Sequence, residues 1–270
     1  YQMIKRLELT KKDHYKLKVY CEKLDILFLS TPYDIESAKF LDEELNIPIF
    51  KTASADIVDI PLQTFIASTL KPCLISIGMA NISEIEKIFK IYQKYQNNNI
   101  AFLHCVSNYP CGDDNLNLNV IKGLKSIFNV PIGFSDHSIG SEAAIASVTL
   151  GARIIEKHFT VDKSLDGPDQ KASSNPTEFA LLVQKIRRVE KMLGNPLKKL
   201  QPEEKEMKYT SRKSLHLVKD INRNEIISDN HLQLKRPGTG LSYEFKEYLV
   251  GKKASKSLKA GHKISLGDVF

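Results

Sequence analysis

Residues 99–135 read NIAFLHCVSNYPCGDDNLNLNVIKGLKSIFNVPIGFS and contain the unit that decides the fold. Two short apolar runs, 99–104 and 130–135, flank an amphipathic stretch near residues 116–128. A strand, a helix and a second strand in this order typically form a parallel βαβ unit. The stretch therefore predicts two neighbouring parallel strands that are joined by a helix.

The same alternation extends from residue 10 to about residue 194. We expect six strands, in the apolar runs 25–30, 48–51, 72–76, 99–104, 130–135 and 152–156. Helical patterns lie near residues 11–24, 35–45, 59–69, 82–96, 116–128, 140–150 and 177–193. Because a helix precedes the first strand, the series fits the later part of a (β/α)8 TIM barrel whose first strands are missing from the sequence. A doubly wound open sheet is the competing architecture.

The composition changes after the last predicted helix. We expect the barrel domain to cover residues 1–194, a linker rich in Pro and charge to cover 195–210, and a second domain to cover 211–270. Within that tail, KDINRNEIISD at 219–229 matches KSLKAGHKISL at 256–266, at a spacing of 37 residues. Two similar short-strand units predict a small, pseudo-symmetric, β-rich domain.

The composition is that of a globular protein. The chain has 270 residues, of which 42% are hydrophobic, and carries a net charge of +7. The Lys and Arg residues form no block and no nucleic-acid-binding signature accompanies them, so we expect no nucleic acid partner. No apolar run reaches the roughly 18 residues of a membrane span, which favours a soluble, cytoplasmic protein without a membrane partner. The four cysteines form no C-x-x-C pair, and we expect free thiols.

In a parallel α/β barrel the active site lies at the carboxyl ends of the strands, so the polar residues that follow each apolar run are the candidates. These are Ser30, Thr31, Lys51, Ser54, Asp56, Ser76, His104, Ser107, Asn108, Tyr109, Ser135, Asp136, His137, Glu156, Lys157 and His158. A lysine among several hydroxyls suits a phosphate group. The sequence has neither a P-loop nor a G-x-G-x-x-G motif, and nucleotide binding is therefore not indicated.

Two histidines, His137 and His158, end consecutive predicted strands. Neutral imidazoles in this arrangement can share one divalent metal ion, with Asp136 and Glu156 as supporting partners. Each histidine alone would also fit an ordinary hydrogen-bonded residue. His104 lies inside a predicted buried strand, where a core histidine is the better interpretation.

Two further residues have a functional and an ordinary interpretation. Asp169 lies in the loop LDGPDQKASS at 165–174, where it either binds sugar hydroxyls or only shapes a turn. Arg236 lies in the rigid turn KRPGTG at 235–240 and, on the residues alone, is an ordinary surface arginine.

The motifs taken together resemble one known family, the bacterial N-acetylneuraminate (sialic acid) synthases with their legionaminate-synthase relatives. The resemblance runs along the whole chain in the family's order. It rests on FLSTP at 28–32, FKTASAD at 50–56, SIGM at 76–79, LHCVSNYP at 103–110, GFSDH at 133–137, EKHFT at 156–160, GPD at 167–169 and KRPGTG at 235–240.

This resemblance implies a TIM barrel followed by an antifreeze-like (SAF) domain, and a domain-swapped homodimer. It implies an enzyme that condenses phosphoenolpyruvate with N-acetylmannosamine and water to give N-acetylneuraminate and phosphate. Two alternatives stay open at this point. One is a legionaminate synthase that uses 2,4-diacetamido-2,4,6-trideoxymannose, and the other is a catalytically inactive homologue that binds carbohydrate.

The resemblance also assigns roles to individual residues. His137 and His158 match the family's ligands for Mn²⁺, or Mg²⁺, and Tyr109 and Asp169 match groups near the acceptor sugar. Arg236 would reach into the partner subunit's site. The groups that match the phosphoenolpyruvate site are Thr31, Lys51, Ser54, Ser76 and Ser135, with either Ser107 or Asn108 on the phosphate side. Asp56 stands where the family usually has Glu, and we expect an acid–base or sugar-orienting role for it.

Overall fold

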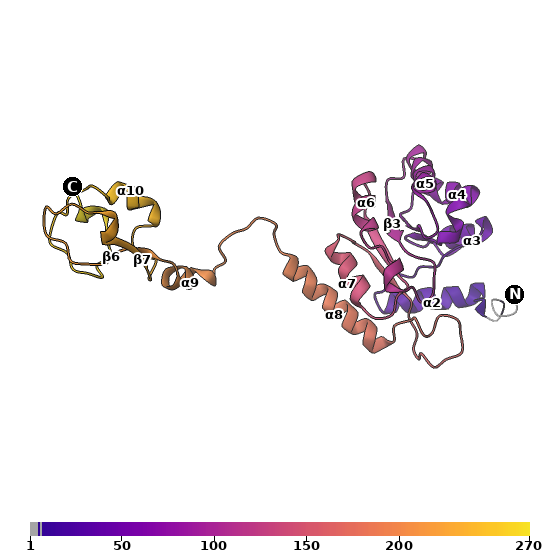
Figure 1. The fold of residues 1–270 in the computed structure, drawn as a ribbon. Helices are drawn as coiled ribbons and strands as arrows, with labels where there is room; N and C mark the ends of the chain where they lie inside the picture. The colour runs from indigo at the N-terminus through magenta and orange to yellow at the C-terminus, as the bar shows by residue number, and fades with distance from the viewer. Residues whose placement is uncertain (1–4, 6) are drawn as a thin grey trace. The chain divides into compact units, whose positions relative to one another are not determined.

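The structure is a computed structural model that describes residue 5 and residues 7–270 (Figure 1). It divides into two units, of which the first ends at Gly194 and the second covers Asn195–Phe270. The first unit contains one parallel sheet with its helices, and the second is a small unit with a two-stranded antiparallel sheet.

The sheet of the first unit has five parallel strands in the order β1-β2-β3-β4-β5. They are β1 (Phe50–Thr52), β2 (Cys73–Ser76), β3 (Ile100–His104), β4 (Ile132–Asp136) and β5 (Ile155–Lys157). The spatial order follows the sequence without a reversal. A doubly wound sheet requires such a reversal, so that alternative is wrong.

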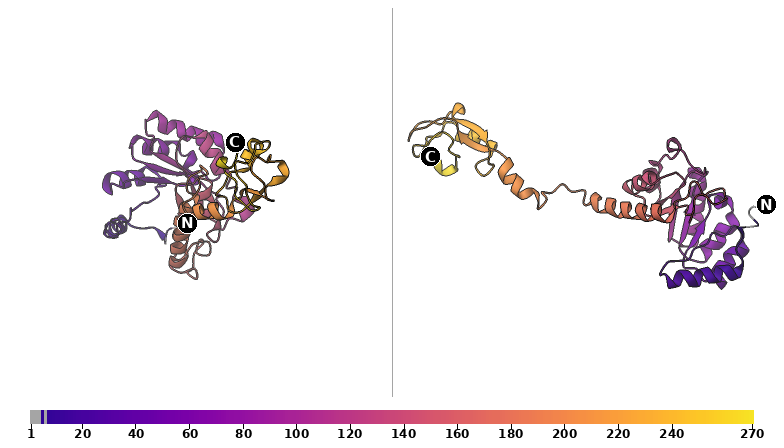
Figure 2. Two further views of the ribbon diagram at one scale, coloured as in Figure 1. Left: turned by 90° about the vertical axis from the view of Figure 1, so that its left-hand side faces the viewer. Right: turned by 90° about the horizontal axis from the view of Figure 1, so that it is seen from below.

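Helices connect successive strands and cover one side of the sheet (Figure 1 and Figure 2). Those that connect strands are α4 (Ile60–Ser68), α5 (Ile82–Lys94), α6 (Val120–Ile127) and α7 (Glu142–Thr149). Helix α2 (Lys11–Lys23) and helix α3 (Ile35–Lys39), with a π-helical turn at Phe40–Glu44, precede β1, and α8 (Pro176–Leu193) follows β5. Short 3₁₀ turns lie at Ser54–Val58 and Asp113–Asn115. Capping boxes begin α2, α5 and α8. Among the described residues, no helix is long and apolar enough to cross a membrane.

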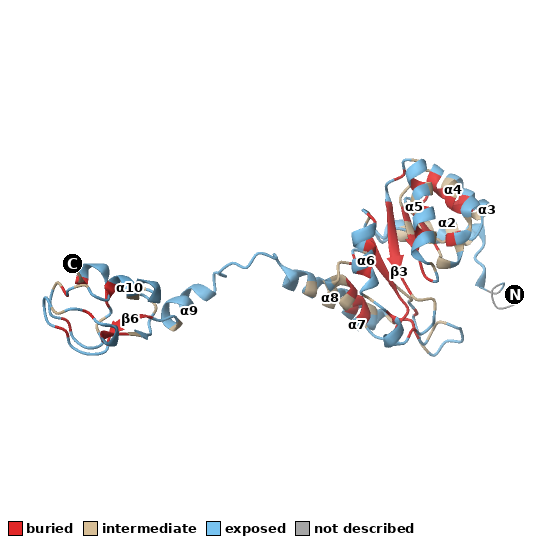
Figure 3. Ribbon diagram, turned by 45° about the horizontal axis from the view of Figure 1, so that its top comes forward, coloured by how far each residue is buried: buried red, intermediate tan, exposed pale blue. Residues whose placement is uncertain are grey.

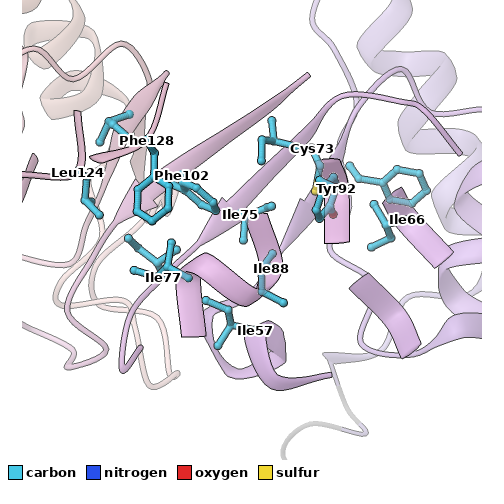
Figure 4. Packing of buried hydrophobic residues seen from close by; sticks show 14 of the residues in the cluster. Ile57, Ile66, Cys73, Ile75, Ile77, Ile88, Tyr92, Phe102, Leu124 and Phe128 are labelled. Atoms are coloured by element: carbon cyan, nitrogen blue, oxygen red, sulfur yellow. The ribbon is translucent and has the colours of Figure 1, made fainter. Parts of the chain in front are cut away.

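The core of this unit lies between the sheet and its helices (Figure 3 and Figure 4). Because side chains alternate along a strand, every second residue faces the helices. The largest of these sheet residues, Phe50, Ile75, Phe102 and Phe134, are fully buried. The residues of the opposite register lie on the other face of the sheet, and they include the polar residues Lys51, Ser76, Ser135 and Glu156.

The predicted first strand, at residues 25–30, is wrong. This segment has no strand pairing in the structure, and the side chains of Ile26 and Leu27 are 59% and 71% exposed. An apolar run becomes a strand only where a neighbouring strand completes its hydrogen bonds, and no segment of the described chain pairs with this one. The other five predicted strands are present, with ends shifted by at most three residues.

The second unit begins with helix α9 (Glu204–Ser211), so the second half of the predicted linker is helical. Strands β6 (Ser214–Leu217) and β7 (Leu232–Lys235) pair antiparallel. The remaining elements are α10 (Lys246–Leu249) and the 3₁₀ turns Asp229–His231, Tyr243–Phe245 and Leu266–Asp268. A separate apolar cluster, which includes Leu215, Leu217 and Ile264, forms the core.

The structure confirms the internal duplication of this unit. Ile221 and Leu258, which are equivalent in the two copies, exchange backbone hydrogen bonds of 2.9 and 2.8 Å with each other. Asn224 and Gly261 are also equivalent, and both have positive φ, at 68° and 84°. Equivalent residues therefore meet at the centre of a pseudo-symmetric unit, as the repeat predicts.

A first prediction concerns Gly133 in β4. A Cβ at this position would lie 2.7 Å from the carbonyl oxygen of Ile154, which accepts the 2.8 Å hydrogen bond from Phe134. We expect Gly133→Ala to lower the free energy of unfolding by about 1–3 kcal/mol in urea denaturation, since the added methyl group has to displace β5. Gly123→Ala is the control, because a Cβ there meets nothing within 4 Å and alanine favours helix α6. Equal stability of the two variants would contradict this packing.

A second prediction concerns Asp268, which is 2% exposed and accepts hydrogen bonds from His262 and Ser265 and pairs with Lys256. Burial alone would raise the pKa of this carboxyl, but these partners together hold it well below its usual value of 3.8. A depressed folded-state pKa stabilises the protein above the unfolded-state pKa, and the stabilisation is lost as the pH falls through the folded-state value. The free energy of unfolding should therefore fall below about pH 4, and Asp268→Asn should abolish most of this dependence. Asp166→Asn, at an exposed position in the first unit, should leave it nearly unchanged, and an unaltered pH profile in Asp268→Asn would refute the assignment.

Candidate active site

The site begins at Lys51, which is 9% exposed and lies on the face of the sheet away from the helices. Its ammonium nitrogen Nζ donates a 2.8 Å hydrogen bond to Ser76 Oγ on the neighbouring strand. It also donates to the carbonyl oxygen of Thr52 at 2.9 Å, and it lies 3.6 Å from the carboxylate of Glu156. A buried cation beside a hydroxyl, near the carboxyl ends of the strands, is suited to hold an anion.

From Glu156 the hydrogen bonds continue to β4. Ser135 Oγ donates to the Glu156 carboxylate at 2.6 Å, and His137 Nε2 lies 3.3 Å from the same hydroxyl. His137 Nδ1 is 2.7 Å from the carbonyl oxygen of Val106, which can only accept. The proton of this imidazole is therefore on Nδ1, and burial lowers the pKa of His137 so that the ring is neutral.

His158 follows β5 and lies beside His137, as the sequence predicted. The two ring centroids are 5.3 Å apart, with an angle of 81° between the rings. Tyr109 contacts both, with centroid distances of 4.2 Å to His137 and 5.2 Å to His158. His158 Nδ1 lies 3.6 Å from the carboxylate of Asp169, which brings the 165–174 loop to the same place.

These residues fit a divalent metal ion. The single hydroxyl proton of Ser135 is directed at Glu156, so the lone pair of His137 Nε2 receives no hydrogen bond from this serine. A neutral imidazole with a free lone pair, beside a second imidazole, is a donor set for Mn²⁺ and similar ions. In the described part of the chain, no third His, Cys, Asp or Glu completes a metal-ligand cluster. Such an ion would keep open positions for water or substrate oxygens.

A second group of hydroxyls surrounds Gly78, directly after β2. The Gly78 backbone N–H donates to Ser54 Oγ at 2.9 Å, and Ser54 Oγ lies 3.1 Å from Cys105 Sγ. A Cβ on Gly78 would lie only 2.5 Å from Ser107 Oγ. Glycine at this position therefore lets Ser54 and Ser107 come close to the end of β2.

Asp56 lies in the 3₁₀ turn after β1. Its Oδ2 atom is buried and, among the described residues, has no hydrogen-bond partner. Burial raises the pKa of this carboxyl, and the nearby Asp59 raises it further, while Lys51 opposes the shift. The role of this unpartnered carboxyl stays a prediction.

Three predicted site residues do not join this network in the structure. Thr31 follows the unpaired segment 25–30, and Asn108 is exposed. Arg236 belongs to the second unit, where its Nε atom donates to the carbonyl oxygen of Ser211 at 3.0 Å. His104 is a core histidine as expected, since it is buried and its Nε2 lies 2.8 Å from the carbonyl oxygen of Leu116.

The contacts of two residues were not predicted. Glu156 was expected only behind the histidines, but it contacts Lys51 and Ser135 directly. Asp136 was expected to support the imidazoles, but its carboxylate contacts Lys157 and Ser138 instead. Strand alternation was the available signal. It places Glu156 and Ser135 together on one face of the sheet, and Asp136 and Lys157 together on the other face.

The fold and the site define an α/β protein whose polar groups converge at the carboxyl ends of parallel strands, the usual place of an active site in barrel-type folds. Comparisons with known proteins agree. Residues 1–198 match the NeuB family and residues 212–269 match the SAF domain. The chain belongs to the NeuB family, the sialic acid synthase family that its motifs resemble.

Individual relatives cover most of the chain. The N,N'-diacetyllegionaminic acid synthase of Campylobacter jejuni is 41% identical over 260 residues, which are 96% of this chain and 78% of that protein. The pseudaminic acid synthase of Helicobacter pylori is 36% identical over 256 residues, or 95% and 75% of the two chains. The crystal structure of N-acetylneuraminic acid synthetase from Leptospira borgpetersenii is 40% identical with a TM-score of 0.73, and the match covers 76% of this chain and 72% of that one.

Proposed function

We propose that this protein is a divalent-metal-dependent synthase that condenses phosphoenolpyruvate with an N-acetylated sugar and water, releasing phosphate. The observation that carries the proposal is the continuous set of contacts from Lys51 and Ser76 through Glu156 and Ser135 to the imidazole pair. A cationic site for an anion and a pair of imidazoles thus lie side by side. The catalytically inactive homologue is less well supported, because a binding protein has no need of this set.

Two sugars are candidates for the acceptor. N-acetylmannosamine, which would give N-acetylneuraminate, is the acceptor expected from the motifs. The relative that is a legionaminic acid synthase covers 96% of this chain, which favours 2,4-diacetamido-2,4,6-trideoxymannose as a second candidate. Both present an aldehyde in their open-chain form and carry an acetamido group at C2, so the same chemistry serves either sugar.

In the proposed reaction, Lys51 and the hydroxyls of Ser54 and Ser76 hold the anionic groups of phosphoenolpyruvate. Tyr109 and Asp169 lie beside the imidazoles and orient the acceptor sugar. A divalent ion held by His137 and His158 would supply Lewis-acid polarisation of the sugar carbonyl. His137 serves that purpose because its contact with Val106 fixes the proton on Nδ1.

The bond changes balance with one water molecule. C3 of phosphoenolpyruvate attacks the aldehyde carbon, and the aldehyde oxygen gains a proton to become a hydroxyl group. In this proposal that proton comes from Asp56, whose pKa burial raises. Water then adds at C2 and returns one proton to Asp56. Cleavage of the bond between C2 and the phosphate oxygen expels phosphate, which takes up the other proton of that water as the C2 hydroxyl becomes the keto group. Lys51 stabilises the negative charge on the departing phosphate.

Two features of the assembly belong to the same proposal. The sheet is an arc of a (β/α)8 barrel, which its sequential parallel strand order and one-sided helices support. The protein acts as a domain-swapped homodimer in which Arg236 contacts the acyl group of the acceptor in the partner's site. The exposed turn that carries Arg236 is compatible with such a contact.

The test measures the release of phosphate from phosphoenolpyruvate in the presence of each of several N-acetylated sugars, with Mn²⁺ or Mg²⁺ added. We expect release with one acceptor, loss of release on metal chelation, and its recovery on adding Mn²⁺. His137→Ala and His158→Ala should each abolish release, since each removes one imidazole. His14→Gln, a histidine outside the site, should retain it. Unchanged turnover in either alanine variant would refute the metal assignment.

A separate prediction concerns the anion site. Lys51→Met removes a charged donor whose hydrogen bonds are worth about 1.5–3 kcal/mol. Since about 1.36 kcal/mol corresponds to a factor of ten, we expect kcat/KM for phosphoenolpyruvate to fall roughly 10- to 150-fold. The affinity for Mn²⁺ should change little. Lys71→Met, which breaks an ion pair with Asp42 away from the site, is the matched control. A loss as large in the control, or none in Lys51→Met, would contradict the assignment of Lys51.

A further inference from the structure

A buried ion pair joins the ends of β4 and β5. Asp136 and Lys157 are cross-strand neighbours, and each directly precedes one of the two site histidines. The Lys157 ammonium is 2.8 Å from the Asp136 carboxylate, and the two side chains are 1% and 0% exposed. The pair is therefore sealed from solvent, in contrast to most ion pairs of this chain.

Both partners also form hydrogen bonds with Ser138, the residue that follows His137. The second oxygen of the Asp136 carboxylate accepts from the Ser138 backbone N–H at 2.9 Å and from its hydroxyl at 2.6 Å. Lys157 donates to the carbonyl oxygen of Ser138 at 2.5 Å. The backbone on both sides of His137 is thus tied to the residue before His158.

The pair cannot act on substrate directly. Strand alternation places Asp136 and Lys157 on the helix side of the sheet, whereas Ser135 and Glu156 lie on the site side. The imidazoles take their ring orientations from other groups, since His137 contacts Val106 and His158 faces Asp169. What the pair fixes is the backbone that carries the two rings.

A purely stabilising role explains this pair poorly. Burying two charges costs free energy that their attraction barely offsets, and an apolar pair of similar size often stabilises a fold more. The neighbouring helix-side residues Phe134 and Ile155 are apolar. An ion pair with directed hydrogen bonds does fix register, and a slip of one residue would turn a histidine away from the site.

We propose that Asp136 and Lys157 form a positioning pair that sets the spacing of His137 and His158 for a shared divalent ion. The inference deepens the proposed function and rests on it for the identity of the ion. The positioning itself concerns the metal-free protein, in which the rings lie 5.3 Å apart.

The test compares the full-length wild type with Asp136→Asn and with the double variant Asp136→Leu/Lys157→Met. Affinity for Mn²⁺ is measured without substrates by the electron paramagnetic resonance signal of the free ion. We expect Asp136→Asn to weaken binding about 10- to 100-fold, the usual effect of removing a group that supports metal ligands. Asp42→Asn, which breaks the 2.7 Å pair with Lys71, is the control and should change affinity less than about twofold.

The double variant separates positioning from stability. Its apolar pair should restore the midpoint of urea unfolding to at least the wild-type value, while Mn²⁺ affinity stays weak. Recovery of both stability and affinity would overturn the proposal. If the wild type itself does not bind Mn²⁺, the proposed function fails, and the positioning is then decided on the metal-free protein. There, a nuclear Overhauser effect between the ring protons of His137 and His158 should be present in wild type and Asp42→Asn and lost in the double variant; its persistence would overturn the pair's role.

Discussion

The alternation of side chains along parallel strands is the constraint on which the rest of the first unit depends. In β4, Phe134 and Asp136 face the helices, and Ser135 lies on the opposite side with His137 after it. The same short strands therefore build a packed core on one side and a polar site on the other. Because parallel strands end at one edge, polar residues that are far apart in the sequence converge there.

The electrostatics of the site follow from which groups are buried and which are paired. Lys51 is a buried cation that shares its donors between Ser76 and the Thr52 carbonyl, and it faces the partly exposed carboxylate of Glu156. His137 is kept neutral by burial. The cationic end and the imidazole end are thus chemically distinct, although the carboxylate of Glu156 contacts Lys51 at one end and Ser135 at the other. The proposed reaction between an anion and a neutral sugar requires such a division.

Much of this arrangement could be predicted from the sequence. Five of the six expected strands are present, and the strand-end rule brought Lys51, Ser76, Ser135, His137 and His158 to one edge. The strand predicted at residues 25–30 is absent. An apolar run does not reveal whether a neighbouring strand pairs with it. The contact of Lys51 with Glu156 spans the sheet from β1 to β5, and its geometry depends on the curvature of the sheet, which no local pattern reports. Alternation predicts that Asp136 and Lys157 lie on the helix side of the sheet, but their pairing depends on the register between β4 and β5.

The central claim is that a divalent ion between the two histidines lies next to phosphoenolpyruvate bound at Lys51. The most direct measurement is the ³¹P relaxation of phosphoenolpyruvate in the presence of the protein and a trace of Mn²⁺. The account predicts saturable paramagnetic relaxation enhancement that His158→Ala abolishes while phosphoenolpyruvate still binds. Binding of phosphoenolpyruvate with no enhancement in the wild type, at Mn²⁺ concentrations that occupy the protein, would contradict it.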